Sequence, residues 1–382
     1  MDLPLSGITV VELGHSVAAP FAGQVLGDLG ARVVKVENPG SGDDCRAWGP
    51  PFWHGSSAAF QSLNRNKLSI AVDLKDEAEA ARLRAFIVAE ADVVIQNLRP
   101  GQAERFGVGE RLREGAKRLI YCNLGAFGAG GPLSERPGYD PLMQAFGGIM
   151  SVTGEPGRPP VRVGPSIVDM GSGLWSVIGI LAAIEGRHRT GEGCVVDTSL
   201  YETALSWMTV PVAMALASGR EPGRTGTEAA MIVPYKAYEA ADRWLVIAAG
   251  NDALFRRLCE VLGRREWADD PRFAGNAARV QHREALNDMI AALVATRPAA
   301  HWMEKLDAAG VPAAPLQGVN EVLAHPQTRA LGMVRPLPGT AMSLMSTPIR
   351  FDGERLPFRS APPALGAHTD EILQPLPAEA KP

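Results

Sequence analysis

The sequence has few of the residues that bind metal ions or form disulfides. Its four cysteines, Cys45, Cys122, Cys194 and Cys259, lie far apart in a chain of 382 residues. They have neither the close pairing of a zinc site nor the density of a disulfide scaffold. The seven histidines are scattered singly, without ligand spacing. We therefore expect no metal centre and a reducing, cytoplasmic location.

The chain also lacks a strong excess of charge. Its formal net charge is -4 and its isoelectric point is about 6.0, so it has no basic field for nucleic acid or an anionic membrane. The N-terminal MDLPLSGITVVELG has no basic segment, and Glu12 interrupts its apolar run, which argues against a cleaved signal. The longest apolar stretch, Leu174 to Ile184, is shorter than the roughly 20 residues that span a bilayer. We expect a buried helix there, and neither nucleic-acid nor membrane partners.

Several common catalytic motifs are missing as well. The segment RVVKVE places Glu37 where a dinucleotide-binding fold would hold a ribose. However, neither Gly14–Pro20 nor Gly128–Gly131 matches G-x-G-x-x-G, which disfavours a nicotinamide-dependent dehydrogenase. No G-x-S-x-G or P-loop motif occurs, so the commonest hydrolase and nucleotide-hydrolysing classes are disfavoured too.

Apolar periodicity predicts an open α/β layer in the N-terminal half. An apolar run at residues 8–13 is followed by a helical pattern that ends at Gly30 and by a second apolar run at 32–37. This is a βαβ unit, which builds a parallel sheet. The same reasoning predicts strands at 69–73, 92–96, 118–123 and 194–200, and helices at 75–90 and, longest of all, 168–187.

The sequence pattern in the second half of the chain predicts a smaller α+β domain. The polar segment REPGRTGT at residues 220–227 reads as an interdomain linker. A hairpin is expected at 235–249, helices at 253–262, 279–295 and 299–309, and a short strand at 311–316. We therefore expect a large Rossmann-like domain at 1–219, the linker, a small domain at 228–325, and a linker and tail at 326–382.

The run GPSIVDMGSG places Asp169 where a Gly/Pro loop meets the long apolar helix. One interpretation is structural, because Ser166 and Asp169 have the spacing of a capping box and a carboxylate in a first helical turn stabilises the helix dipole. The other is chemical. Gly171 and Gly173 would let a substrate carbonyl approach, helix-end amides would polarise it, and the carboxylate would attack it. The pattern alone leaves both interpretations open.

Motifs along nearly the whole chain carry a family resemblance. They include GHSVAAPFAGQVLGDLGARVVKVENPGSGDDCR, NRNKLSIAVDLK, DVVIQNLRPG, GYDPLMQAFGGIMSVTG, VDMGSG and the C-terminal APPALGAHTDEIL. In this order and spacing, the sequence resembles the family III CoA-transferases. The resemblance implies large Rossmann-like and small domains joined by linkers, a tail that returns to the large domain, and two chains interlocked as a homodimer.

The resemblance also implies the site residues. Asp169 is the expected nucleophile, Tyr139 would orient it or the incoming acid, and Lys75 and Arg105 can pair with phosphates. No cofactor is expected beyond coenzyme A as co-substrate. The expected coenzyme contacts are His15, Ala18, Val72, Asp73, Leu74, Lys75, Asn97, Leu98, Arg99, Arg105, Tyr139 and Asp140.

Departures from the formyl-CoA transferase pattern bear on the substrate. Val17 stands where that enzyme has a glutamine, and Asn38 where it has an arginine. A glycine-rich loop of that enzyme has no counterpart around residues 248–252. The sequence is similar in this respect to plainer family members, which suggests a small dicarboxylic acid as acceptor and succinyl-CoA as donor rather than formate or oxalate.

The resemblance leads to a transferase reaction through an aspartyl anhydride and an aspartyl-CoA thioester. The nearest alternative is an α-methylacyl-CoA racemase, whose motif reads G-H-D where this chain has Gly138, Tyr139 and Asp140. A tyrosine with an ordinary pKa near 10 is a poor base at neutral pH, which favours the transferase. The other alternative is a non-catalytic CoA-binding member of the fold.

Overall fold

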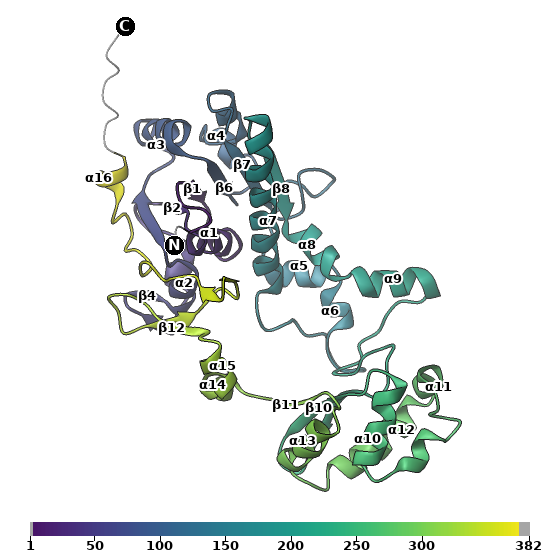
Figure 1. Ribbon diagram of the computed structural model, residues 1–382. Coiled ribbons are helices and arrows are strands. Elements are labelled where there is room, and N and C mark those ends of the chain that lie inside the picture. Colours follow the sequence, from purple (N-terminus) through teal and green to yellow (C-terminus); the bar gives the residue numbers. More distant parts are fainter. Residues whose placement is uncertain (1–2, 374–382) are drawn as a thin grey trace. The chain divides into compact units, whose positions relative to one another are not determined.

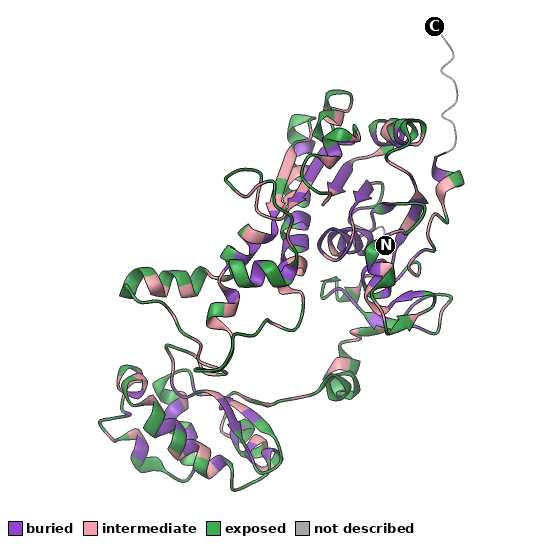
Figure 2. Ribbon diagram, turned by 180° about the vertical axis from the view of Figure 1, so that it is seen from behind, coloured by how far each residue is buried: buried purple, intermediate pink, exposed green. Residues whose placement is uncertain are grey.

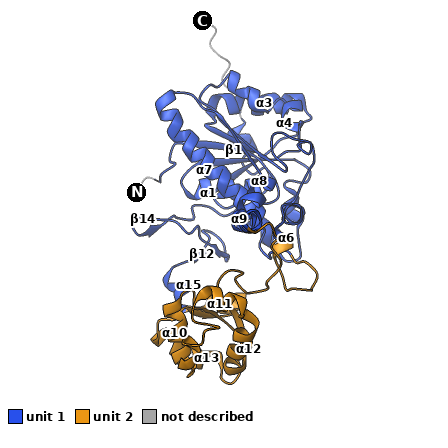
Figure 3. Cartoon of the chain, turned by 90° about the vertical axis from the view of Figure 1, so that its right-hand side faces the viewer, with its two compact units in different colours: residues 1–149, 162–217, 326–382 blue, residues 150–161, 218–325 orange. Residues whose placement is uncertain are grey.

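Figure 1 shows the computed structural model of the chain, in which residues 3–373 are described. The chain divides into two compact units, coloured separately in Figure 3. Unit 1 comprises residues 1–149, 162–217 and 326–382, and unit 2 comprises residues 150–161 and 218–325. The ends of the predicted large domain and tail, residues 1–2 and 374–382, lie outside the described part.

Residues 150–161, which the sequence assigns to the large domain, group with unit 2. The N–H of Gly226 donates to the Gly154 carbonyl at 2.9 Å. The Arg224 side chain donates to the carbonyls of Glu155 and Arg158 at 3.4 and 2.6 Å. These bonds join the segment to the stretch that the sequence predicts as a linker.

Unit 1 is built on a six-stranded parallel sheet with the order β5-β2-β1-β6-β7-β8. The chain moves outward from β1 through β2 to β5, returns to β6 beside β1, and moves outward again through β7 and β8. This is a doubly wound order with its switch point between β1 and β6, and it confirms the predicted α/β fold. The strands are β1 (Thr9–Leu13), β2 (Arg32–Glu37), β5 (Lys67–Ala71), β6 (Val93–Gln96), β7 (Ile120–Gly125) and β8 (Val195–Ser199).

Successive strand residues face two different cores. Val10 and Val33 pack in a core with residues of α1 (Ala18–Asp28) and α7 (Ile167–Thr190). Val11 and Val34 pack in a second core with residues of α3 (Glu77–Glu90). Strands covered on both faces need apolar side chains on both, which explains the unbroken apolar runs of the sequence. Figure 1 shows α1 and α7 together, apart from α3.

The connections between strands carry the remaining elements of the sheet layer. Between β2 and β5 lie η1 (Asp44–Ala47), β3 (Phe52–Trp53), β4 (Ser56–Ser57) and α2 (Ala58–Leu63). Between β6 and β7 lie α4 (Gln102–Arg105) and η2 (Glu110–Glu114). α5 (Asp140–Phe146), α6 (Ile149–Val152) and α7 precede β8, and α8 (Leu200–Trp207) and α9 (Thr209–Ser218) follow it.

The last described segment covers the free edge of β5. The His368 N–H donates to the Ser69 carbonyl at 2.9 Å, and the Ser69 N–H donates to His368 Nδ1 at 3.2 Å. The Ala71 N–H donates to Thr369 Oγ1 at 2.9 Å. An edge strand that would otherwise expose its polar groups is thus paired.

The C-terminal segment of unit 1 begins at residue 326. Its elements are α15 (Pro326–Ala330), β12 (Val334–Pro336), β13 (Ser343–Met345), β14 (Arg350–Phe351), β15 (Glu354–Arg355) and α16 (Thr369–Ile372).

Unit 2 has the α+β composition that the sequence predicts. A three-stranded antiparallel sheet has the order β11-β10-β9. The predicted single helix at 279–295 is wrong, because two helices meet at His282, whose φ of -108° and ψ of 26° are not helical. The elements are β9 (Tyr235–Glu239), β10 (Trp244–Ala248), α10 (Asp252–Val261), η3 (Arg265–Ala268), α11 (Asn276–Gln281), α12 (Arg283–Val294), α13 (Ala299–Ala308), β11 (Ala313–Pro315) and α14 (Val319–Ala324).

The long helix α7 is buried on one face only. Val177 and Ile180 lie in the core, whereas Leu174 and Ile178 are 44% and 54% exposed. Within residues 3–373, α7 is the one helix long and apolar enough to match a membrane span by length and composition. Every residue of α9 is at least partly exposed, as the green and pink of Figure 2 show. The predicted buried helix is therefore wrong for the outer face of α7.

Candidate active site

The carboxyl ends of the parallel strands lie at one edge of the sheet and carry most of the predicted site. Gly14 and His15 follow β1, Val72 follows β5, and Asn97 follows β6. In doubly wound sheets this edge, at the switch point between β1 and β6, is where ligands bind. Two cavities open there.

The turn after β1 is held by contacts from distant segments. Ser16 has a positive φ of 69°, and its N–H donates to Asp43 Oδ1 at 2.9 Å. The His15 N–H donates to Asn97 Oδ1 at 3.0 Å, and Asn97 Nδ2 donates to the His15 carbonyl at 2.9 Å. His15 Nδ1 lies 3.0 Å from Ser16 Oγ. These bonds fix the His15 backbone at the point where the two cavities meet.

A buried network of charges supports this turn. Lys35 Nζ lies 2.8 Å from Glu12 Oε1 and from Asp43 Oδ2, and donates to the Gly14 carbonyl at 2.7 Å. Lys67 Nζ lies 2.8 Å from Glu12 Oε2. The Lys35, Glu12 and Lys67 side chains are fully buried. Each charge therefore depends on its partners, because an unpaired ion in such a place is strongly destabilising.

The network also sets several protonation states. Burial opposes the charge of Lys35, but Glu12 and Asp43 more than offset it and raise the pKa of Lys35. Burial lowers the pKa of Lys67 to about 8, and the neighbouring Lys35 charge adds to the decrease, although Glu12 opposes it. Burial lowers the pKa of His15 too, although Asp43 opposes this. The lowered pKa favours the neutral imidazole of His15 at pH 7.

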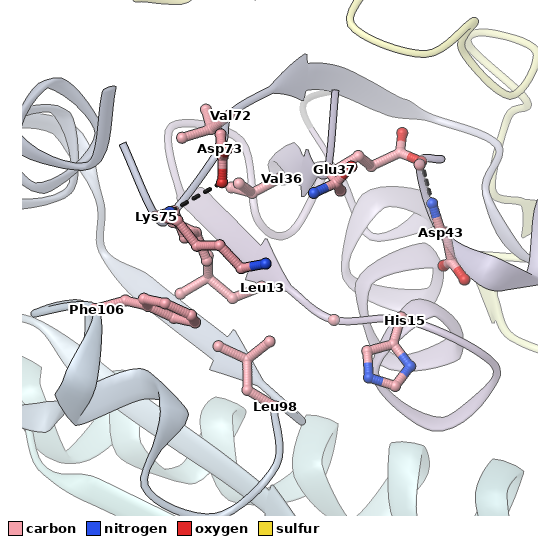
Figure 4. A pocket seen from close by; sticks show the side chains of 14 residues that line it. Leu13, His15, Val36, Glu37, Asp43, Val72, Asp73, Lys75, Leu98 and Phe106 are labelled. Atoms are coloured by element: carbon pink, nitrogen blue, oxygen red, sulfur yellow. Dashed lines mark hydrogen bonds between the residues drawn. The ribbon is translucent and has the colours of Figure 1, made fainter. Parts of the chain in front are cut away.

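The smaller cavity has a volume of about 230 Å³ and lies beyond the ends of β1, β2 and β5. Figure 4 shows the Phe106 ring, Leu13 and Leu98 around it, with the Lys75 side chain alongside. Its apolar walls and polar rim suit a flat organic group that carries polar substituents. The lining residues are Leu13, Gly14, His15, Val36, Glu37, Asn38, Gly42, Asp43, Val72, Asp73, Leu74, Lys75, Leu98 and Phe106.

Glu37 lines this cavity, but its carboxylate already has partners. Arg46 Nε and Nη2 donate to it at 2.7 and 2.8 Å, Ser69 Oγ at 2.6 Å, and the Asp43 N–H at 3.0 Å. Burial works against the ionised form, yet these donors lower the pKa of Glu37. With its oxygens occupied, this carboxylate is poorly placed for the ribose contact of a dinucleotide-binding fold.

The larger cavity has a volume of about 390 Å³ and contains Asp169. It shares His15 and Leu98 with the smaller cavity, so a long ligand can occupy both. Its lining residues are His15, Ser16, Ala18, Gln96, Asn97, Leu98, Arg99, Pro100, Gly101, Glu104, Asn123, Leu124, Gly125, Ala126, Gly128, Ala129, Ser134, Glu135, Pro137, Gly138, Tyr139, Asp169, Asp197, Thr198 and Leu200.

Asp169 lies in the first turn of α7 and is half-buried. Burial raises the pKa of Asp169 from 3.8 to about 7, and the nearby Asp140 carboxylate adds to the increase. A carboxylate that is poorly stabilised by water or cations is a stronger nucleophile and base than an ordinary one. Asp169 therefore lines a cavity and has a raised pKa.

The capping box of the structural interpretation does not form. Ser166 is the N-cap residue of α7, but among the described residues its side chain makes no capping hydrogen bond. Asp140 Oδ2 instead accepts hydrogen bonds from the N–H groups of Val168 and Asp169, at 2.8 and 3.2 Å. The cap comes from α5, at a distance along the chain that a local motif does not detect.

Gly171 and Gly173 do not open space for a substrate carbonyl, as the chemical interpretation of the sequence supposed. Both lie inside α7 and are buried, where backbone N–H groups bond to the preceding turn. A Cβ atom at Gly171 would lie 2.7 Å from Trp207 Cζ2, and one at Gly173 would lie 2.7 Å from the Ala18 carbonyl oxygen. The glycines allow close packing of α7 against its neighbours.

Most of the other predicted residues line one of the two cavities, and two do not. His15, Ala18, Asn97, Leu98, Arg99 and Tyr139 line the larger cavity, and Val72, Asp73, Leu74 and Lys75 line the smaller one. Asp140 lines neither cavity and is buried, at 2% exposure. Arg105 is exposed beside Phe106, with its guanidinium carbon 5.9 Å from the ring centroid.

Some lining residues were missed by the sequence reasoning. Phe106 directly follows α4, and Asn123 and Asp197 lie in β7 and β8. Asn123 Nδ2 donates to Asp197 Oδ1 at 2.9 Å, and Gln96 Nε2 donates to Asn123 Oδ1 at 2.7 Å. Their positions near the carboxyl ends of neighbouring parallel strands were the available signal. Within residues 3–373, no three His, Cys, Asp or Glu side chains gather as metal ligands.

Comparison with known proteins identifies the family. Residues 5–369 match the model of CoA-transferase family III. The chain belongs to that family. It is 39% identical to the succinate–glutarate CoA-transferase of Agrobacterium fabrum, over 98% of this chain and 96% of that protein. It is 39% identical to the acetyl-CoA:oxalate CoA-transferase of Acetobacter aceti, over 92% of this chain and 90% of that protein.

A solved structure agrees with this assignment. The crystal structure of a CAIB/BAIF family protein from Brucella suis superimposes with a TM-score of 0.87 at 41% identity, covering 97% of this chain and 99% of that one. The CoA-transferase predicted from the sequence motifs is confirmed at the level of family and enzyme class. The two adjoining cavities belong to a family III CoA-transferase.

Proposed function

We propose that this CoA-transferase uses Asp169 to move coenzyme A from an acyl-CoA donor to a carboxylic acid acceptor. The observation that carries the proposal is the position of Asp169. It lies in a cavity that adjoins a second one, and burial raises its pKa to about 7. Tyr139, 53% exposed in the same cavity, is available to orient the acid.

The coenzyme would extend across both cavities. Its adenosine end suits the smaller cavity, where Phe106 and Leu74 offer apolar surface. Lys75 lines the smaller cavity, Arg99 lines the larger one, and Arg105 lies beside Phe106; all three are exposed cations that can pair with the phosphates. The thioester would then reach past His15 to Asp169. A neutral His15 can donate or accept a hydrogen bond to this part of the coenzyme, and it carries no positive charge that would attract the phosphates.

Each step of the proposed reaction replaces one group on a carbonyl carbon by another, either a thiolate or a carboxylate. Asp169 attacks the donor thioester, a carbon–oxygen bond forms, and CoA leaves as the thiolate, giving an aspartyl acyl anhydride. The thiolate attacks the aspartyl carbonyl of this anhydride, which releases the donor acid and leaves aspartyl-CoA. The acceptor carboxylate then displaces the thiolate, and the thiolate attacks the new acyl group to form product and free Asp169.

We propose succinyl-CoA as donor and a small dicarboxylic acid as acceptor. Support comes from relatives named for succinate, glutarate and citramalate, with 36% to 39% identity over nearly the whole chain. The oxalate-using relative has the same 39% identity as the glutarate-using one, so the acceptor must be determined by assay. No cofactor besides coenzyme A forms part of the proposal.

The proposed assembly is an interlocked homodimer in the cytoplasm. Exposed apolar side chains on α7 and α9 support a covering partner, since surfaces of this kind mark interfaces. They include Leu174, Trp175 and Ile178 on α7 and Val210 and Leu216 on α9. A second copy of the chain is the expected partner.

Intact-mass spectrometry tests the nucleophile. Wild-type protein incubated with succinyl-CoA should gain a CoA-sized or acyl-sized adduct, which hydroxylamine converts to a hydroxamate at Asp169. Asp169→Asn should give no adduct. Glu185→Gln changes an exposed carboxylate of the same helix and should behave as wild type. If several acyl-CoA donors leave Asp169 unmodified in the wild type, the proposal fails.

A racemase is the second candidate, because a carboxylate with a pKa near 7 could also move a proton at a substrate α-carbon. Tyr139 stands where such an enzyme would need a second base. Deuterium exchange at the α-carbon of an α-methylacyl-CoA, without an adduct, would favour the racemase. Coenzyme binding with neither reaction would favour a non-catalytic member of the family.

A further inference from the structure

The catalytic helix is capped by a carboxylate from another helix. Both Asp140 Oδ2 contacts, to the N–H groups of Val168 and Asp169 at 2.8 and 3.2 Å, fall at the start of α7. Asp140 is itself the first residue of α5. The nucleophile's own backbone N–H is therefore bound to a second, buried carboxylate.

Asp140 is held in place from its other side. Gln144 Nε2 donates to Asp140 Oδ1 at 2.6 Å, so both carboxylate oxygens have partners. Gln144 is fully buried, and its Oε1 accepts from the Val163 N–H at 2.8 Å. This chain of bonds links α5, the segment before α7 and α7 itself. It fixes the position of the Asp169 backbone.

The arrangement also changes the electrostatics of the nucleophile. Free N–H groups at a helix start carry partial positive charge that would stabilise a carboxylate in the first turn. Here Asp140 binds two of these groups and brings a negative charge of its own. Burial is the main cause of the raised pKa of Asp169, and repulsion by Asp140 is the second.

We propose that Asp140 is a positioning residue that fixes the start of α7 and places a second carboxylate beside Asp169, and thereby promotes acylation of Asp169. The proposal rests on the proposed nucleophilic role of Asp169. Asp140 lies outside the residues that line the larger cavity, so it acts through Asp169 and not on substrate.

The proposed reaction predicts which state of Asp169 the Asp140 charge disfavours. Free Asp169 carries a negative charge, whereas aspartyl anhydride and aspartyl-CoA are neutral at that side chain. A neighbouring negative charge disfavours the free carboxylate relative to both intermediates. Removing the Asp140 charge should therefore lower the fraction of enzyme present as adduct and lower the pH at which Asp169 ionises.

The test compares Asp140→Asn with wild type. Asparagine keeps the shape and one oxygen acceptor for the α7 amides, but it has no charge. Asp140→Ser, which offers a neutral hydroxyl cap, is the second variant in case the first one does not fold. Ser166→Ala is the matched control, since the described residues give the Ser166 side chain no capping bond. Circular dichroism melts establish that each variant is folded.

The readout is adduct at Asp169, measured by intact mass after a single addition of succinyl-CoA at pH values from about 5 to 9. In Asp140→Asn we expect the acidic limb to move to lower pH by about one unit and the adduct yield to fall about tenfold. A folded neutral variant with the wild-type profile would overturn the proposal and leave Asp140 as a structural cap. No adduct in wild type would instead overturn the nucleophilic role of Asp169.

Discussion

Asn97 holds the backbone of His15 by both ends of its side-chain amide, with hydrogen bonds of 3.0 and 2.9 Å. The two residues are 82 positions apart and follow the two central strands, β1 and β6. Their contact crosses the switch point of the sheet, where the two cavities share His15. The amide of Asn97 thus shapes the turn after β1, and the same residue lines the larger cavity.

Asn97→Ala removes both bonds and leaves the half-buried His15 backbone without this partner. We expect a loss of about 1–3 kcal/mol in the free energy of unfolding and weaker binding of acyl-CoA, because the turn after β1 loses its support. Urea denaturation and titration with a non-reactive CoA analogue measure the two effects. Asn97→Asp keeps the acceptor and should be intermediate. Unchanged coenzyme affinity in Asn97→Ala would contradict the role of this contact.

Asp169 should make the protein less stable as pH rises. Its pKa is about 7 in the folded protein and 3.8 ordinarily. The folded state therefore binds the proton more tightly between pH 4 and 7, and the free energy of unfolding falls over this interval. Below pH 4 Asp169 causes no loss in the free energy of unfolding, and above pH 7 the full loss is present. This is the sign expected for a buried functional carboxylate.

Asp169→Asn removes the penalty and should stabilise the protein by about 1–3 kcal/mol at pH 8. The gain should disappear near pH 4, where the wild-type side chain is protonated in both states. Urea denaturation at several pH values measures this. Glu185→Gln is again the control, and its stability difference from wild type should stay small at each pH. A constant effect of Asp169→Asn from pH 4 to 8 would be inconsistent with the raised pKa.

Local sequence patterns could predict the sheet and its functional edge, because strand periodicity and βαβ spacing determine both. They could not predict the buried charges beneath that edge. Glu12, Lys35 and Lys67 interrupt apolar runs in β1, β2 and β5 and would be read as solvent-facing. Only the register, which pairs Glu12 with Lys35, brings the three side chains together.

The cap of α7 was missed for a related reason. Ser166 and Asp169 have the local spacing of a capping box, whereas the true cap, Asp140, lies in another helix. Contacts between segments far apart in a sequence depend on packing that periodicity does not describe. The same limit applies to Phe106, which lines the smaller cavity but belongs to no local motif.

The tail should control coenzyme affinity through Thr369. Its Oγ1 accepts from the Ala71 N–H at 2.9 Å, directly before the Val72–Lys75 segment of the smaller cavity. Thr369→Val keeps the shape and removes this acceptor, which should raise the Kd for acyl-CoA about three- to tenfold with little change in kcat. Thr190→Val alters an exposed threonine at the end of α7 and should leave Kd unchanged. Equal Kd values for the two variants would refute the coupling.

The glycines of α7 should respond oppositely to the same substitution. A Cβ at Gly173 would meet the Ala18 carbonyl oxygen at 2.7 Å, whereas none of the described atoms lies within 4 Å of one at Gly186. Both residues lie inside the helix, so alanine improves helix propensity equally.

Gly186→Ala should therefore stabilise the protein by about 0.5–1 kcal/mol, and Gly173→Ala should destabilise it by about 1–3 kcal/mol because backbone must move. Urea denaturation of both variants measures the difference. Since Ala18 lines the larger cavity, Gly173→Ala should also reduce adduct formation at Asp169. Equal stabilisation by both substitutions would mean that α1 can move away from α7 at little cost, and the close contact would then not position the site.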